Sequence, residues 1–321
     1  METAKRKKAG LLGSQWFFLL IVIAAISLFT SILNPRFVRI GNIINILQQV
    51  STLGVVAAGA TILIISGNFD ISVAANLGLS ACVMAMLINA GVPSGLAVPA
   101  GILVSVVCST FVGVSSILFR APSFIISLAA IGIFKGTSLA LTEAVLQTIY
   151  GKFEFLGATR LFGIVPLLFL ISLAIYAVVF VILKYTLLGR RVYAIGNNPT
   201  AAYLSGIDIK ANKIVFFVIN GVFVGVAAMM MLSRIGAAQA STGNGMELTA
   251  IGAVVIGGTT MDGGKGGIVG TFLGVLLMGV IGNALNMLQV SPYFQDVING
   301  AVIVLAIAVS SLSQANRNTV A

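Results

Sequence analysis

Histidine is absent from this sequence of 321 residues, and only 8% of the residues are charged. Without histidine, imidazole proton relays and histidine-ligated metal sites are excluded. An ordinary soluble domain carries roughly 25% charged residues, so the charges here are too few to cover a surface that faces water. The composition therefore excludes a soluble globular protein and a disordered chain.

Cysteine is also scarce, because the chain holds only Cys82 and Cys108. Both lie in apolar runs, where a free cysteine behaves as a small buried hydrophobe, and no disulfide framework is implied. Apolar residues make up 59% of the chain, and the mean hydropathy is +1.11. They form continuous runs and not the alternation typical of membrane β-barrel strands. The sequence therefore predicts an all-α, polytopic membrane protein.

A membrane span needs about 20 apolar residues, and about ten segments meet or approach that length. They lie near residues 16–33, 43–66, 72–90, 96–118, 122–142, 164–184, 214–232, 248–260, 268–288 and 295–312. The eighth is too short to cross as a regular helix, and glycines crowd its end. We expect it to be broken or re-entrant and surrounded by protein or by a water-filled cavity. No linker separates a second folded domain, so residues 1–321 should form a single transmembrane domain.

The few basic residues predict the orientation, because cytoplasmic loops are enriched in Lys and Arg. The basic N-terminal segment 1–15 is best explained as cytoplasmic and followed by an uncleaved first span. With ten crossings, twelve of the 18 Lys and Arg residues fall inside, five fall outside, and Lys135 lies within a span. Both termini are then cytoplasmic, and the net charge of +10 reflects orientation and not nucleic-acid binding.

The most informative polar segment is the inner loop 185–213, which together with Lys184 just before it holds five of those twelve basic residues. A short helix is expected from Thr200 to Ser205, with Asn198 as its cap and Gly206 as its stop. Small residues at Ala201, Ala202 and Gly206 would let another protein dock closely. A solvated linker between spans is the alternative. The turn before the helix is expected at Gly196, Asn197, Asn198 and Pro199.

Neutral polar residues inside the spans are the best indication of a solute pathway. They recur at helical spacing in the second, third and ninth spans. Amides and hydroxyls supply donors and acceptors without a desolvated charge, which suits a polyhydroxylated solute. Hydrogen bonding between packed helices is the alternative. The eight residues are Asn42, Asn45, Gln49, Thr52, Asn76, Ser80, Asn283 and Asn286.

Two acidic residues, Asp70 and Asp262, are expected at the inner ends of spans. An acidic group in a membrane segment suggests a function, because its burial is costly. For Asp70 we weigh a gating role against the alternative that it caps a helix at shallow depth.

The glycine-rich run 257–270 does not fit a Walker A phosphate loop. Thr259 stands where that motif begins with glycine, and Gly266 replaces its Ser or Thr. The glycines are better explained by close backbone approach at a helix break. Lys265 should face lipid or a partner at the inner surface. Gating or structural roles are therefore expected for Gly258, Gly263, Gly264 and Lys265.

Three stretches of the chain resemble the permeases of ribose/xylose/galactose ATP-binding-cassette importers. They are GNNPTAAYLSGI at 196–207, GGTTMDGGKGG at 257–267 and SGNFDISV at 66–73. With NILQQ at 45–49 and PSFIISL at 122–128, the resemblance extends from about residue 37 to 305 in the family's order. The chain departs from the family's pattern at Asn68 and Ala74, where glycine is usual, and at Lys135, where arginine is more usual.

The resemblance implies a multi-pass permease subunit, in a bacterial inner or plasma membrane, that imports a monosaccharide or similar polar solute. Two permease subunits, identical or related, would bind cytoplasmic ATPase subunits and an extracytoplasmic solute-binding protein. ATP and Mg would bind the ATPases, and this chain would hold no catalytic residue, metal or cofactor. The coupling residues it implies are Gly196, Asn197, Asn198, Pro199, Ala201, Ala202, Ser205, Gly206 and Ile207.

Two other classes of protein remain as alternatives. A secondary, ion-coupled transporter of a polar solute would need ionisable groups at mid-membrane depth, and Lys135 is the one candidate. An integral-membrane enzyme would need a nucleophile or an acid–base pair inside the bilayer, and the sequence suggests none.

Overall fold

The structure is a computed structural model that describes residues 15–291, 293–295, 297–302 and 304. Seven of its helices are long and apolar enough to cross a membrane, which confirms the predicted polytopic helical membrane protein. The helices are α2 (Gln15–Leu33), η1 (Pro35–Val38), α3 (Ile40–Ile65), α4 (Val73–Asn89), α5 (Ser94–Leu118), α6 (Ser123–Thr142), α7 (Phe155–Ala158), α8 (Leu167–Tyr185), α9 (Leu187–Asn197), α10 (Pro199–Leu204), α11 (Ile209–Ile235), α12 (Met246–Ile256) and α13 (Ile268–Met287).

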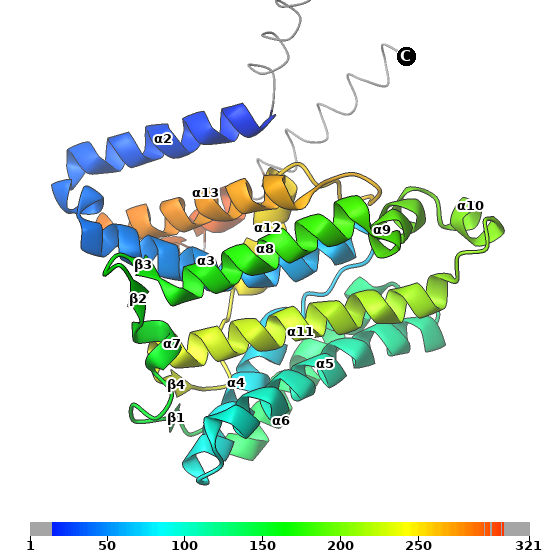
Figure 1. Ribbon diagram of the computed structural model, residues 1–321, viewed down its shortest axis with the longest axis horizontal. Helices are drawn as coiled ribbons and strands as arrows, with labels where there is room; N and C mark the ends of the chain where they lie inside the picture. Colours follow the sequence, from blue (N-terminus) through cyan, green and yellow to red (C-terminus); the bar gives the residue numbers. More distant parts are fainter. Residues whose placement is uncertain (1–14, 292, 296, 303, 305–321) are drawn as a thin grey trace, which may run out of the picture.

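The described residues also include four two-residue strands. They are β1 (Gln147–Thr148), β2 (Arg160–Leu161), β3 (Val165–Pro166) and β4 (Ala237–Ala238). β1 pairs antiparallel with β4, and β2 with β3. Figure 1 shows the strands and α7 at one end of the bundle and α9 and α10 at the other.

The predicted spans agree with the helices at nine positions, although α11 is longer than expected and α4 and α12 are short. The N-terminal segment 1–14 and most of the tenth predicted span lie outside the described residues. The segment 185–213 differs from the predicted loop with one short helix, because most of it is helical. Gly196 and Asn197 belong to α9 and do not form the predicted turn.

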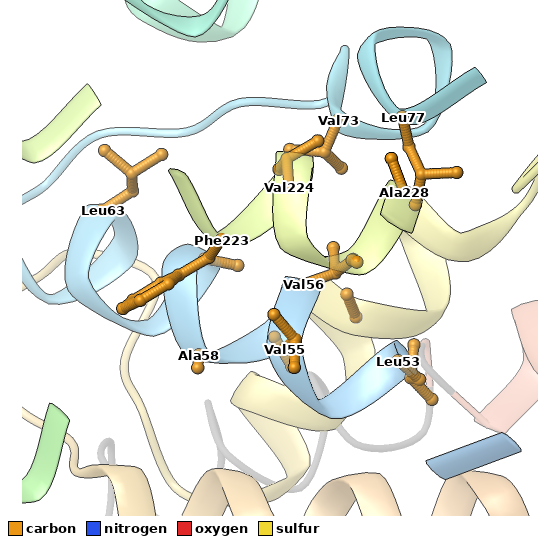
Figure 2. Packing of buried hydrophobic residues seen from close by; sticks show 14 of the residues in the cluster. Leu53, Val55, Val56, Ala58, Leu63, Val73, Leu77, Phe223, Val224 and Ala228 are labelled. Carbon is orange, nitrogen blue, oxygen red and sulfur yellow. The ribbon is translucent and has the colours of Figure 1, made fainter. Parts of the chain in front are cut away.

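The helix α3 forms the centre of the bundle, and nearly all of its second half is buried. This half of α3 consists largely of small and β-branched residues, so neighbouring helices can approach it closely. Figure 2 shows Val55 and Val56 of α3 near Phe223 and Val224 of α11, with Val73 of α4 beside them. The central core therefore joins α3, α4 and α11.

The helices α5 and α11 run antiparallel along most of their length. Gly113 lies against Phe217, and Gly225 lies against Ile102, so residue numbers rise along one helix as they fall along the other. The C-terminal end of α5 therefore lies at the same end of the bundle as the start of α11, α9 and α10.

The first broken span lies between α3 and α4, where residues 66–72 leave the helix and run into the bundle. Backbone groups without helical partners must be satisfied inside a membrane protein. The amide of Phe69 donates to Ser123 Oγ at 3.0 Å, and that of Ile71 donates to Ser127 Oγ at 3.1 Å. Two serines of α6 thus replace helical hydrogen bonds, and α4 begins inside the bundle.

A second irregular segment, residues 236–245, joins α11 to α12. After Gly236, the chain passes through β4 and an irregular segment before α12 begins at Met246. This segment passes the side of α4, where a Cβ on Gly78 would lie 3.0 Å from the Ala240 carbonyl oxygen and 3.2 Å from that of Thr242. The helix α12 has 11 residues and is flanked on both sides by irregular backbone.

A pair of buried asparagines joins α3 to α13. Asn42 Nδ2 donates to Asn283 Oδ1 at 2.8 Å, and Asn283 Nδ2 donates to Asn42 Oδ1 at 2.9 Å. Both side chains are at least nine-tenths buried. The two amides satisfy each other, as expected of a packing contact between helices.

Replacing one member of this pair should leave the other amide without its partner. We expect Asn283→Leu to lower the free energy of unfolding by about 1–3 kcal/mol, the typical cost of a buried unsatisfied polar group. Thermal unfolding in detergent measures the effect, and Asn45→Leu, at an exposed position of α3, is the control. The double variant Asn42→Leu/Asn283→Leu should recover stability. A double variant less stable than either single one would contradict a simple pairing.

Candidate functional site

The helices α9 and α10 lie at one end of the bundle, and a capping side chain defines the start of each. Thr186 Oγ1 accepts from the Gly189 amide at 3.3 Å at the start of α9. Asn198 Oδ1 accepts from the Ala201 amide at 3.0 Å, which caps α10 as the sequence predicts. Gly206 follows α10 with φ +82°, a left-handed conformation that favours glycine.

The outward face of α10 includes Ala201 and Gly206 of the predicted docking face but not Ala202. Ala202, expected to meet a partner, is only 4% exposed and packs into the protein's own core. The neighbouring Tyr203 is 67% exposed and Leu204 is 80% exposed. Large apolar side chains so exposed on a short helix are typical of a docking surface. The helical periodicity of the sequence could have indicated that Tyr203 is exposed if Ala202 is buried, because adjacent residues point to different sides of a helix.

The inner surface of α9 packs against the end of α3 and against the glycine-rich loop 257–267, which joins α12 to α13. The Gly264 amide donates to the Ile65 carbonyl at 2.8 Å. Tyr193 Oη donates to the Gly266 carbonyl at 2.9 Å. Partial burial raises the pKa of Tyr193, so its hydroxyl keeps its proton and remains a donor.

Glycine is required where these three segments meet. A Cβ on Gly196 would collide with the Ile65 carbonyl and the Gly264 amide. Gly263 and Gly264 adopt φ +82° and +72°. The glycine-rich run therefore brings backbones into close contact, as the sequence predicts, while Lys265 is exposed. The helix α9 is thus in direct contact with the end of α3 and with the glycine-rich loop.

Asp70 is buried in the first broken span, which corrects the expectation of a shallow position. Its Oδ1 accepts from the Ser72 amide at 2.9 Å and from the Ser72 hydroxyl. Its Oδ2 accepts from Ser109 Oγ at 3.3 Å and from Asn220 Nδ2 at 3.1 Å. Ser109 and Asn220 lie well inside α5 and α11, so the carboxylate joins three helices across the bundle and does more than cap α4.

Sequence reasoning missed Ser109, Asn220, Ser123 and Ser127, which hold the broken segment in place. Ser123 and Ser127 recur four residues apart, as do Ser105 and Ser109, which is a helical-periodicity signal that the predicted pathway did not use. Asn220 is a single polar residue within an apolar run. The partners of the four missed residues are backbone groups and a carboxylate distant in the sequence, so only the tertiary structure brings them together.

The eight predicted pathway residues do not share one surface. Among those in α4, Asn76 Nδ2 donates to the Ser105 carbonyl at 3.1 Å, and Ser80 Oγ donates to Asn76 Oδ1 at 3.3 Å. Their hydrogen bonds, like those of Asn42 and Asn283, are made within the bundle. Thr52 is buried, Gln49 is partly buried, and Asn45 and Asn286 are exposed. The predicted single polar face of the second span is therefore divided between the core and the surface.

Metal binding finds no support in the side-chain arrangement. Among the residues that the structure describes, no group of three or more His, Cys, Asp or Glu side chains could hold a metal ion. Cys82 and Cys108 are both buried as free thiols.

Comparison with known proteins identifies similar permeases. Residues 42–307 match the family model described as the permease component of the branched-chain amino acid transport system. The ribose import permease RbsC of Bacillus subtilis is 37% identical over 90% of this chain and 89% of its own length. RbsC of Escherichia coli K12 is 34% identical over 96% of each chain. The D-allose transport system permease AlsC of the same strain is 37% identical over 92% of this chain and 90% of its own. No solved structure matches the chain.

Proposed function

The chain belongs to the family of permease components of the branched-chain amino acid transport system, and on that premise we propose that it forms the membrane pathway of an ATP-binding-cassette importer for a monosaccharide. The similarity to the ribose and D-allose permeases supports a sugar as the solute. The observation that carries the mechanism is the contact of α9 with both the end of α3 and the glycine-rich loop. The chain itself is not an enzyme, because members of this family form the non-catalytic transmembrane component of the transporter.

The proposed topology has about ten spans, with both termini and the α9–α10 end in the cytoplasm of a bacterium. Basic residues gather at that end of the bundle, as the inner side of a membrane protein requires. They are Arg120, Lys184, Arg190, Arg191, Lys210, Lys213 and Lys265. At the opposite end lie Arg36, Arg39, Lys152, Arg160 and Arg234. In the proposed assembly, ATP and Mg bind the ATPase subunits, and a second permease subunit and a solute-binding protein complete the importer.

In the proposed mechanism, closure of the ATPases pushes on the exposed face of α10. The push passes through α9 to Ile65 and Gly264, which are joined by a hydrogen bond. From there it reaches the two broken spans, which hold fewer helical hydrogen bonds and so shift more easily. ATP binding can change the pathway only because the ATPases contact α10 differently in their two states.

Reconstitution tests the proposed function. The chain, with its ATPase and solute-binding protein, should take up D-ribose, D-allose or D-xylose into proteoliposomes when ATP is supplied to the ATPase side. The chain alone should not concentrate any of these sugars with a proton or sodium gradient. Gradient-driven uptake without an ATPase would instead establish the secondary transporter.

The outward face of α10 should be needed for ATPase binding. We expect Leu204→Asp to weaken co-purification of the ATPase by about tenfold or more, because it places a carboxylate in an apolar contact. Leu161→Asp, on exposed β2 at the opposite end, is the matched control. Normal ATPase binding by Leu204→Asp would show that docking occurs elsewhere.

A further inference from the structure

A small pocket lies where the two broken spans resume as helices. It is bounded by the start of α4 at Ala74, by Lys135 of α6, and by the segment that leads into α12. Thr242, Asn244 and Glu247 supply the polar side chains of that segment. Residues from three separate elements thus line one pocket. None of them takes part in the contacts of α9 and α10.

The pocket is far from both ends of the bundle. Lys135 lies near the middle of α6, which spans Ser123–Thr142. The segment that carries Thr242 reaches the side of α4 at Gly78, which is inside that helix. Irregular backbone at such depth is tolerated where it lines a cavity or is covered by protein. Discontinuous helices that meet at mid-depth commonly form the binding sites of transporters.

Glu247 has an unused acceptor in this pocket. Its Oε2 is buried and has no hydrogen-bond partner among the described residues. Glu247 lies in the first turn of α12, with the backbone amides of Gly245 and Glu247 near its carboxylate. A buried carboxylate oxygen without a partner is costly, so a hydroxyl donor from a ligand would satisfy it.

Lys135 supplies the opposite charge on an exposed side of α6. A lysine near the centre of a membrane helix is costly in lipid and is usually found facing a water-filled path. The other large exposed side chains of α6, such as Leu128 and Leu139, are apolar, so the pocket supplies the polar surroundings that the Lys135 ammonium needs. With one ammonium and one carboxylate, the pocket has no net charge and favours an uncharged solute over an ion.

We propose that this pocket is a binding site for the hydroxyl groups of the sugar in transit, an inference that rests on the proposed function. The Glu247 carboxylate accepts hydrogen bonds from sugar hydroxyls, and the Lys135 ammonium donates to a sugar oxygen. Thr242 and Asn244 can both donate and accept. Because the pocket is small, it contacts part of a monosaccharide and binds it weakly enough to release it.

Transport kinetics of the complete importer test the proposal. For whichever of D-ribose, D-allose and D-xylose the wild-type complex carries, Glu247→Gln and Lys135→Met should each raise the KM of ATP-driven uptake by about tenfold, because a lost charged hydrogen bond weakens binding on that scale. ATPase co-purification should be unchanged. Glu143→Gln, an exposed carboxylate at the end of the same helix α6, is the matched control.

Thiol labelling gives a direct measure of binding that does not depend on turnover. Thr242→Cys in the full importer is treated with a small thiol reagent, with and without the transported sugar; the native Cys82 and Cys108 are buried. Saturating sugar should slow labelling several-fold, whereas Leu146→Cys, exposed at the end of the bundle, should be unaffected. Unchanged KM in both charge variants, or labelling insensitive to sugar, would overturn the pocket while the importer still works. A wild-type complex that carries none of the three sugars would overturn both proposals.

Discussion

Gly196→Ala is expected to reduce ATP-driven uptake by more than about tenfold while the ATPase subunit still binds. The added methyl group would collide with the Ile65 carbonyl and the Gly264 amide, which are backbone atoms and cannot rotate away. The contact between α9, α3 and the glycine-rich loop would have to open, and the push from the ATPases would no longer reach the broken spans. Uptake, ATP hydrolysis and ATPase co-purification are measured on the same preparation.

A glycine in the adjoining loop provides the control. Gly267 has open space where its Cβ would lie and an extended φ of −179°, which any residue adopts. Gly267→Ala should therefore transport normally. Loss of ATPase binding by Gly196→Ala would mean that the surface of α10 had been disturbed as well. Normal uptake by Gly196→Ala would show that the coupling path does not run through this contact.

Asp70→Ala is expected to have the largest effect on stability. The variant leaves the Ser72 amide and Asn220 Nδ2 without the acceptor that Asp70 supplies. These donors are fixed in direction, whereas the hydroxyls of Ser72 and Ser109 can turn to other acceptors. At roughly 1–3 kcal/mol for each buried unsatisfied donor, the free energy of unfolding should fall by about 2–6 kcal/mol.

Denaturant or thermal unfolding in detergent measures this loss. Asp70→Asn keeps one carbonyl oxygen for the Ser72 donors and should be intermediate. Asp262→Ala, at an exposed position in the glycine-rich loop, should unfold like the wild type. Stability of Asp70→Ala equal to that of the wild type would contradict the role of the carboxylate in holding the first broken span.

Most helix positions could be predicted, because a span must be long and apolar regardless of its neighbours. The 26 residues of α3 and the 20 residues of α13 agree with the predicted spans to within a few residues. The eighth span was predicted to be broken from its length and its glycines alone. The interruption before α4 was predicted, because the spans 43–66 and 72–90 leave residues 67–71 between them. That these residues run inside the bundle was not predicted, since only their hydrogen bonds to the serines of α6 show it.

The candidate site was predictable where it depends on local chemistry. The Asn198 cap and the left-handed Gly206 follow from residue types that favour these conformations. Of the residues predicted to dock a partner, Ala201, Ser205 and Gly206 are exposed. Only Ala202 is buried, because its burial depends on how α10 packs against the bundle. Glu247 was missed entirely, since it opens a short helix next to Lys135 only after the chain has folded.

The sequence by itself determined that this protein lies in a membrane, how its spans are spaced, and which end faces the cytoplasm in the proposed topology. These properties depend on the transfer of single segments from water to lipid and on the placement of a few charges. The tertiary structure alone decided which polar groups form hydrogen bonds inside the bundle and which do not. Hydrogen bonds such as those of Asn42 with Asn283 and of Asp70 with Asn220 join segments far apart in the chain, and no local pattern records them.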